Sequence, residues 1–193
     1  MAALGLLGGT FDPIHCAHLE LAHEVKDALA LSAVHLVPVG DPPHRRAPVA
    51  SATDRLAMLT LAVAAYPGLV VDDREVRRQG KSYTVLTLAE MRAEAPARPL
   101  ALLLGADQFL ALPTWHRWRE VFGFAHLVVV ARPGLPLPDA IPAPLDEEWH
   151  SRRRTDPAAL ARGDVEAVRG LLPPAVLAYI ERHNLYVSPP DAT

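Results

Sequence analysis

Cysteine is nearly absent from this chain, since Cys16 is the only one among 193 residues. A single cysteine excludes a disulfide framework and a metal site built on cysteines, and it fits the reducing environment of the cytoplasm. The N-terminus lacks a basic segment followed by a long apolar core, so we predict no signal peptide. No apolar run approaches the ~20 residues of a membrane-spanning helix, so we expect a cytoplasmic protein with no membrane partner.

An excess of positive charge is also missing. Lysine and arginine number 19 against 22 aspartates and glutamates, which gives a formal net charge of −3 at pH 7. A protein that binds nucleic acid through a basic surface needs the opposite balance, so we expect no nucleic-acid partner. Hydrophobic residues are plentiful, at 50% of the chain. They suffice for the core of one domain spanning residues 1–193, and no internal repeat or second domain is visible.

Short apolar runs predict the strands of a parallel sheet. These runs cover residues 4–7, 34–39, 69–71, 100–104 and 126–130. Helical patterns lie between them: apolar residues recur at steps of three and four from Leu19 to Leu29, and Ser51 is placed to cap a helix running to about Ala65. Strands that alternate with helices imply right-handed βαβ units. We therefore predict an α/β fold, a Rossmann-like open parallel sheet with helices on both faces.

The most informative stretch joins the first predicted strand to the first predicted helix. It reads Gly8-Gly9-Thr10-Phe11-Asp12-Pro13-Ile14-His15-Cys16-Ala17-His18. Glycine lets the backbone approach a ligand closely, and a helix N-terminus presents free N–H groups and the positive end of the helix dipole, which together favour an anion. His15 and His18 are three residues apart and fall on one face of the first turn. This stretch predicts a site for a phosphorylated ligand, with two imidazoles beside the phosphates.

The paired histidines allow other interpretations. They could be two of the three protein ligands that a catalytic zinc ion needs, but the other seven histidines are scattered and no HExxH pair exists. Histidines at this spacing are also common as ordinary surface residues, and a glycine pair before a helix is often only a tight turn. A zinc-binding or purely structural protein therefore remains an alternative from these residues alone.

Two further candidate segments follow predicted strands, at the edge where open α/β sheets bind ligands. The loop at 40–46 is stiffened by two prolines and made positive by His44, Arg45 and its neighbour at position 46. Gly105 and Asp107 lie just after the run at 100–104. The carboxylate of Asp107 suits either a hydrogen bond to ribose hydroxyls or the capping of the helix that follows.

Other segments have mainly structural interpretations. Residues 72–75, with mixed charge, are expected to form a solvated edge with an ion pair. Ser82 is the expected N-cap of a helix whose inward positions include Leu88 and Met91. In the stretch at 112–118, Pro113 and Thr114 mark the expected start of another helix. The two tryptophans there favour half-buried packing, although an indole beside a mononucleotide site can also stack on a pyridine ring.

The stretch from Gly8 to His18 resembles the GGTFDPIHxGH signature of the nicotinate-nucleotide adenylyltransferases, within the wider HxGH nucleotidyltransferase superfamily. One position departs, because Ala17 stands where the family has glycine. The loop at 40–46 is similar to the family's PPH[RK] loop, which contacts the substrates. LPTW at 112–115 is similar to a motif whose tryptophan stacks on the nicotinate, and residues 172–186 look like the family's C-terminal helix and ending.

This resemblance implies an enzyme that transfers the AMP moiety of ATP to nicotinate mononucleotide, giving deamido-NAD and pyrophosphate. The implied catalytic residues are His15 and His18. The implied contacts with ATP are Gly8, Gly9, Thr10, Phe11, His15, His18, Gly105 and Asp107. The implied contacts with the mononucleotide are His44, Arg45, Tyr83, Thr84 and Trp115. Mg²⁺ is expected to bridge the phosphate oxygens of ATP with few protein ligands, so we expect no separate metal site.

The C-terminal part departs from the family. Family members have a late apolar strand and an ISSTxIR-type segment that holds the ATP phosphates, whereas this chain has no serine or threonine from Asp156 to Val187. We therefore expect one strand fewer than in the family, besides a proline-rich surface crossing at 133–144 and a flexible tail at 187–193. Two alternatives follow: a nucleotide-binding protein of the same fold with impaired catalysis, and an adenylyltransferase that uses nicotinamide mononucleotide.

Overall fold

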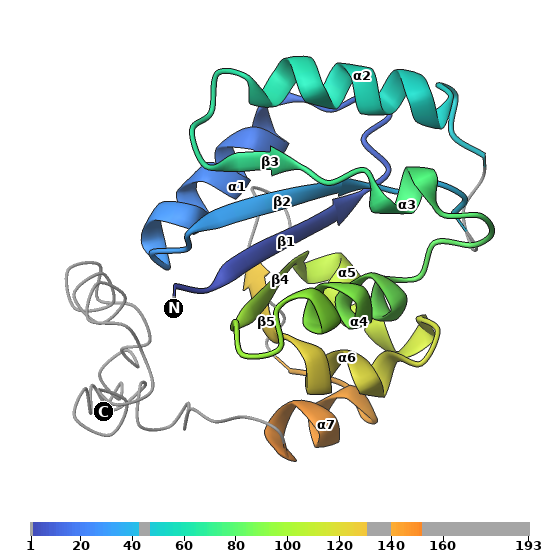
Figure 1. Ribbon diagram of the computed structural model, residues 1–193. Coiled ribbons are helices and arrows are strands. Elements are labelled where there is room, and N and C mark those ends of the chain that lie inside the picture. The colour runs from blue at the N-terminus through green and yellow to red at the C-terminus, as the bar shows by residue number, and fades with distance from the viewer. Residues whose placement is uncertain (1, 43–46, 131–139, 152–193) are drawn as a thin grey trace, which may run out of the picture.

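The computed structural model describes residues 2–42, 47–130 and 140–151, and these form a parallel sheet with helices on both of its faces (Figure 1). The strands are β1 (Leu4–Gly9), β2 (Ala33–Pro38), β3 (Leu69–Val71), β4 (Leu100–Gly105) and β5 (His126–Val130). The helices are α1 (Cys16–Ala28), α2 (Ala52–Val63), α3 (Arg74–Arg77), α4 (Thr84–Glu94), α5 (Ala106–Ala111), α6 (Trp118–Phe124) and α7 (Leu145–Ser151), with a 3₁₀ turn, η1 (Leu112–Thr114), before α6.

The strand order is β3-β2-β1-β4-β5, and each neighbouring pair is parallel. The five apolar runs of the sequence are therefore all strands, and the predicted open parallel α/β sheet is confirmed. The expected absence of a late strand falls in the part of the chain after residue 151, outside the described residues, as do the tail at 187–193 and most of the proline-rich crossing at 133–144.

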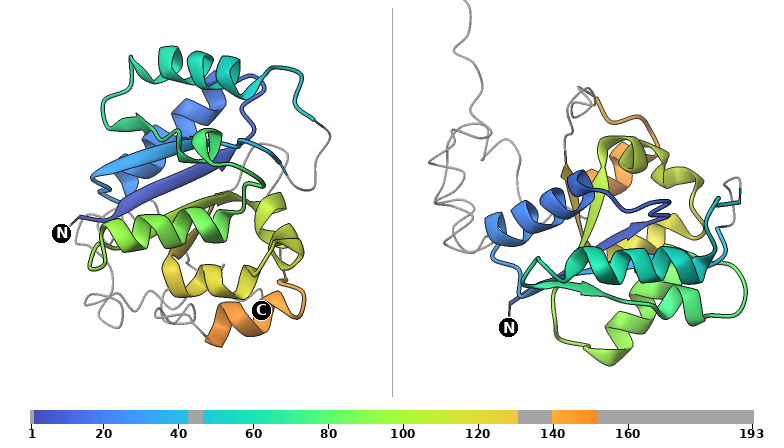
Figure 2. Two further views of the ribbon diagram at one scale, coloured as in Figure 1. Left: turned by 45° about the vertical axis from the view of Figure 1, so that its right-hand side comes forward. Right: turned by 90° about the horizontal axis from the view of Figure 1, so that it is seen from above.

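The sheet separates two hydrophobic cores, one under α1 and α2 and the other under α4 to α7 (Figure 2). Successive residues of a strand point to opposite faces. In β1, Leu6 accordingly enters the core beside α4, and Leu7 enters the core beside α1. Burying each such leucine contributes about 1.5–3 kcal/mol to folding. The inward-facing positions predicted for α4 are confirmed, because Leu88 and Met91 are both buried, and Leu59 of α2 is fully buried as well.

The two predicted helix caps have different outcomes. Ser51 is the N-cap of α2, as predicted, and its hydroxyl accepts a hydrogen bond from the Asp54 amide at 3.1 Å. Ser82 is not the cap of α4, because Tyr83 occupies that position. Ser82 is instead buried, and its hydroxyl accepts a hydrogen bond from the Gly40 amide at 3.1 Å. This contact, made across 42 positions of sequence, ties the start of α4 to the loop after β2.

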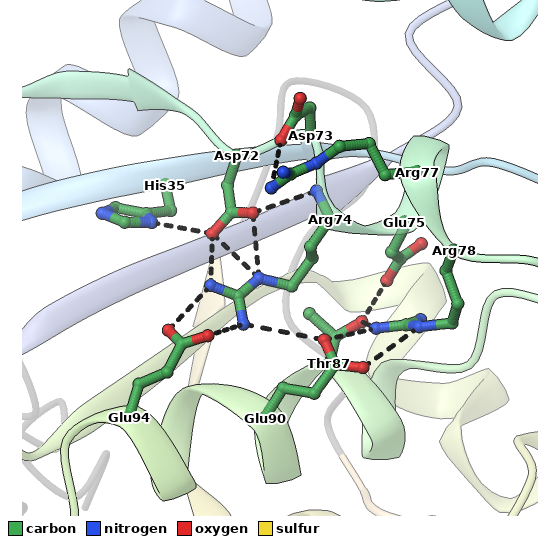
Figure 3. Close-up of polar contacts among 10 residues, drawn as sticks. All are labelled: His35, Asp72, Asp73, Arg74, Glu75, Arg77, Arg78, Thr87, Glu90 and Glu94. Carbon is green, nitrogen blue, oxygen red and sulfur yellow. Dashed lines mark hydrogen bonds and ion pairs between the residues drawn. The ribbon is translucent and has the colours of Figure 1, made fainter.

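The segment after β3 is more buried than the predicted solvated edge. The side chains of Asp72 and Glu75 are only 9% and 8% exposed, although the expected ion pair does form, between Asp72 and Arg74 (Figure 3). The Arg74 guanidinium also bonds to Glu94 on α4, and His35 on β2 places Nδ1 3.1 Å from Asp72 Oδ2. The prediction failed because α4 covers this segment and supplies partners from a distant part of the chain.

Burial by itself would raise the pKa of Asp72, but the hydrogen bonds from His35 and Arg74 outweigh it and hold the pKa well below its usual range. A carboxylate whose pKa is lower in the folded chain stabilises the fold fully above its unfolded pKa of about 3.9. That stabilisation is lost progressively as the pH falls below this value, because the carboxyl of the unfolded chain takes up a proton there while that of the folded chain stays ionised.

Replacing Asp72 tests this network. We expect Asp72→Asn to lower the free energy of unfolding at pH 7 by about 2–3 kcal/mol, because Arg74 loses a buried anionic partner. The difference from wild type should shrink below pH 4. Asp73→Asn is the matched control, since Asp73 pairs with the exposed Arg77 and should change stability by less than about 1 kcal/mol. Urea unfolding between pH 3 and 7 measures both changes in unfolding free energy. Equal changes would show that the buried ion pair stabilises the fold no more than the exposed one.

Candidate active site

The site lies where the direction of strand addition reverses. From β1 the chain adds β2 and β3 on one side, then returns to add β4 and β5 on the other. In open α/β sheets the carboxyl ends of the two strands at such a point flank a ligand crevice. Pairing between β1 and β4 runs from Leu4 opposite Leu100 to Leu6 opposite Leu102, and it stops short of the final residues Gly9 and Gly105. The ends of the two strands are therefore not paired with each other.

Residues 8–15 run from the end of β1 to the start of α1 at this edge, and we call them the phosphate loop after the ligand predicted for them. His15 is the N-cap of α1, and His18 lies in the helix's first turn. Their rings stack with centroids 3.7 Å apart, and Phe11 meets the His18 ring edge-on at 5.2 Å. The structure thus brings the two predicted catalytic histidines together at the helix N-terminus. Ala17 lies between them with an exposed side chain.

The two glycines of the phosphate loop have different surroundings. A Cβ on Gly9 would lie 2.7 Å from the ring of Phe11, which is only 3% exposed and part of the core beside α1. A Cβ on Gly8 would meet nothing within 4 Å. Gly9 is therefore required by the packing of Phe11, whereas Gly8 leaves open space at the exposed end of β1.

A second loop is held against the phosphate loop by a pair of charged residues. Asp12 accepts hydrogen bonds from the backbone N–H groups of Ala50 and Val49, which lower the pKa of its carboxyl. Arg55 on α2 donates from Nη1 to the Thr10 carbonyl at 2.7 Å and from Nε to the Ala50 carbonyl at 3.3 Å. Arg55 was not among the site residues predicted from the sequence. The available signal was its position four residues before the inward-facing Leu59, on the same face of α2.

Aromatic side chains mark another part of this edge. Tyr83 is the N-cap of α4, and Thr84 is the first residue of that helix. Trp115 is partly buried against the core beside α4. His116 follows Trp115 in the sequence, and the centroid of its ring lies 4.3 Å from that of the Tyr83 ring. His116 was not among the predicted site residues. The core packing expected for Trp118 is confirmed, because its side chain is 7% exposed.

The helix expected to begin at Pro113 and Thr114 begins later. These residues form the 3₁₀ turn η1, and α6 starts at Trp118 after Arg117, whose φ of 51° is left-handed. An ordinary helix cannot pass through a left-handed residue, so the turn and the helix are separate. Trp115 therefore lies in the extended connection between them.

The capping interpretation of Asp107 is wrong, because Gly105 is the N-cap of α5. Asp107 lies in the first turn of α5, is exposed, and accepts a hydrogen bond from the Gln108 side chain at 3.0 Å. Its contact with ribose stays a prediction. His44 and Arg45, the remaining predicted site residues, lie outside the described residues.

Among the described residues, the histidine pair lacks the neighbours that a metal site built from protein ligands would need. Within residues 2–42, 47–130 and 140–151, no group of three or more histidine, cysteine, aspartate or glutamate residues is arranged to hold a metal ion. His15 and His18 thus have no third ligand in the described part of the chain. In that same part, no helix is long and apolar enough to cross a membrane.

The sequence also matches a known protein family. A family model described as cytidylyltransferase-like matches residues 6–170, so the chain belongs to the cytidylyltransferase-like family. A protein of Laribacter hongkongensis named "Probable nicotinate-nucleotide adenylyltransferase" is 44% identical over 210 residues, covering 96% of this chain and 95% of that protein. One of the same name from Pseudomonas fluorescens is 45% identical over 215 residues, covering 96% and 98%. Within the family, the chain is thus one of the nicotinate-nucleotide adenylyltransferases.

Solved structures show the same fold. Nicotinic acid mononucleotide adenylyltransferase from Plasmodium falciparum, complexed with NaAD, superposes with a TM-score of 0.65. The alignment covers 96% of this chain and 98% of that one, at 15% sequence identity. The same protein complexed with APC superposes with a TM-score of 0.62.

The two glycines provide a matched test of the phosphate loop. We expect Gly9→Ala to lower the free energy of unfolding by about 1–3 kcal/mol, because the new methyl group overpacks the buried Phe11 ring. Gly8→Ala should change it by less than about 0.5 kcal/mol, because the methyl group enters open space. Chemical denaturation measures both. Equal stability of the two variants would show that Phe11 does not constrain position 9.

Proposed function

We propose that this chain transfers the AMP moiety of ATP to nicotinate mononucleotide, forming deamido-NAD and pyrophosphate in NAD biosynthesis. The carrying observation is the stacked pair His15 and His18 at the start of α1, beside the glycine turn at the sheet's crevice. Relatives named for this activity match nearly the whole chain. We place the reaction in the cytoplasm, because a single cysteine fits a reducing compartment.

The chemistry needs little from the protein except position and charge. A phosphate oxygen of the mononucleotide attacks the α-phosphorus of ATP, the bond from that phosphorus to the oxygen bridging to the β-phosphate breaks, and pyrophosphate leaves with the bonding electrons. No proton has to move. The protein must align two anions and stabilise the negative charge that develops on the α- and β-phosphates.

The phosphate loop has the groups for this task. We assign His15 and His18 to the ATP phosphates, together with the backbone N–H groups of Thr10 and Phe11. Gly9 is still paired with β2, opposite Pro38, and is assigned to the close approach of the backbone to ATP. The dipole of the 13-residue helix α1 adds positive potential at the same point. Mg²⁺ enters as part of the ATP substrate, held mainly by phosphate oxygens.

Nicotinate mononucleotide is the second substrate in this proposal. Trp115 offers an indole face for the pyridine ring, and Tyr83 and Thr84 begin α4, whose N-terminal N–H groups favour an anion. The carboxylate of nicotinate is such an anion and the amide of nicotinamide is not, so this environment favours the acid. Asp107 is assigned to the ribose of ATP, at the end of β4.

One observation favours a second candidate function, a nucleotide-binding protein of this fold that no longer turns over. The alignment with the Laribacter relative spans 210 positions, more than the 193 residues of this chain. That relative therefore contains residues with no counterpart here, in keeping with the expected lack of an ISSTxIR-type segment. A chain without that segment has lost one of the groups that neutralise the ATP phosphates in the family.

A single assay separates these functions. Purified protein is given ATP, Mg²⁺ and either nicotinate or nicotinamide mononucleotide, and pyrophosphate release is followed. We expect faster release with nicotinate mononucleotide than with nicotinamide mononucleotide. Measurable release with the nicotinamide compound would show that the site tolerates the amide. No release from either, together with a rise of the thermal midpoint on adding ATP, would support the binding protein. Neither release nor stabilisation would contradict the proposed site.

Alanine substitution tests the roles of the histidines. We expect His18→Ala and His15→Ala each to lower kcat about 100-fold or more, because each removes a donor aimed at developing charge. His23→Ala is the matched control on the same helix, where His23 pairs with Asp27 four residues on, and it should keep wild-type turnover. Wild-type kcat in His18→Ala, measured by pyrophosphate release, would overturn the assignment.

A further inference from the structure

Arg55 is the most deeply buried charged side chain among the described residues, at 1% exposure. Arginine is almost never fully buried unless its guanidinium is paired. Here the partners are mainly backbone carbonyls: Thr10 at 2.7 Å, Ala50 at 3.3 Å and Gly40 at 3.5 Å. These carbonyls come from the phosphate loop and from the two ends of the loop between β2 and α2. One guanidinium therefore joins two loops that meet at the edge of the site.

Only arginine can make this set of contacts. Its planar guanidinium has five N–H donors spread over one plane, whereas the lysine ammonium is a compact charge at the end of a flexible chain. Asp12 lies close enough to favour the charged form of Arg55 and opposes the effect of burial on its pKa. Asp12 also accepts hydrogen bonds from the N–H groups of Val49 and Ala50. The phosphate loop is therefore attached to the loop before α2 twice, directly through Asp12 and indirectly through Arg55.

The bond to Thr10 decides how the next peptide is oriented. The carbonyl of Thr10 and the N–H of Phe11 belong to the same planar trans peptide, so they point in opposite directions. When Arg55 holds the carbonyl toward α2, the Phe11 N–H faces away from α2. Phe11 also has a φ of 50°, a left-handed conformation that a non-glycine residue keeps only when its surroundings impose it. The Phe11 ring, buried in the core, supplies the second constraint.

We propose that Arg55 is a positioning residue for ATP, which fixes the Thr10–Phe11 peptide so that its N–H group is presented to the nucleotide phosphates. This role rests on the proposed adenylyl transfer. Arg55 touches neither substrate, and it acts through the backbone of the phosphate loop. It also fixes the two ends of the loop after β2 through Gly40 and Ala50, so both loops at the crevice share one anchor.

Arg55→Lys tests the proposal, because lysine keeps the charge but its compact ammonium cannot reproduce the spread of donors that the guanidinium presents to the three carbonyls. We expect kcat/KM for ATP to fall about 100-fold through loss of alignment, with KM for the mononucleotide near its wild-type value. ATP affinity measured by calorimetry should weaken in parallel, and this readout does not depend on turnover. Arg55→Gln, which keeps two N–H donors without the charge, replaces the lysine variant if that variant fails to fold.

Arg74→Lys is the matched control. Arg74 is also a largely buried arginine that joins separate elements, but it does so through Asp72 and Glu94, beside α3 and α4 rather than at the phosphate loop. We expect Arg74→Lys to lower the thermal midpoint and to leave ATP affinity unchanged. Equal ATP affinity in wild type and in Arg55→Lys would overturn the positioning role while leaving the proposed function intact. The wild-type chain could also bind ATP without turning over, which would contradict the proposed function. In that case, weaker ATP binding by Arg55→Lys than by the wild type would still support the positioning role.

Discussion

In the proposed function, the phosphate loop poses the constraint on which the site depends. Its backbone N–H groups have to face a ligand, so the protein must hold the loop from the side away from that ligand. After Gly9, where the pairing with β2 ends, the loop cannot be held by regular secondary structure, because a strand ladder or a helix would use those same N–H groups. Three other contacts hold it, namely the buried Phe11 ring, the bond from Arg55 to the Thr10 carbonyl and the attachment of Asp12 to the next loop. Glycine at position 9 follows from the same constraint, because the Phe11 ring occupies the space of a Cβ.

The way in which each buried charge is compensated also differs across the fold. Arg74 is surrounded by carboxylates, so its positive charge is neutralised where it stands (Figure 3). Arg55 is bonded to neutral carbonyls, and the nearby Asp12 is occupied by backbone N–H groups. A chain with a net charge of −3 can in this way present positive potential at one small site through helix termini, imidazoles and amides. Overall charge therefore says little about the ligand of such a site.

The features that were predictable are those set by local pattern. An apolar run such as 100–104 can only be stable when covered on both faces, so the sheet and its two helical layers follow from the sequence. Ser51 caps its helix because the bond reaches only to Asp54, three residues on. Ser82 has the same chemistry, but a distant amide, that of Gly40, competes successfully for its hydroxyl. The sequence alone does not show whether a serine will bond to a nearby amide or to a distant one.

By itself, the sequence determined the order of the strands along the chain, the glycine turn and the placing of His15 and His18 on one face of α1, because each depends on neighbours within a few residues. The tertiary structure decided which segments meet that turn. Arg55 shows the difference, since its three carbonyl partners lie 5, 15 and 45 residues away and come together only when β1 and β2 pair and α2 packs over them. A buried guanidinium selects whatever acceptors the fold brings to it, and no local pattern encodes that choice.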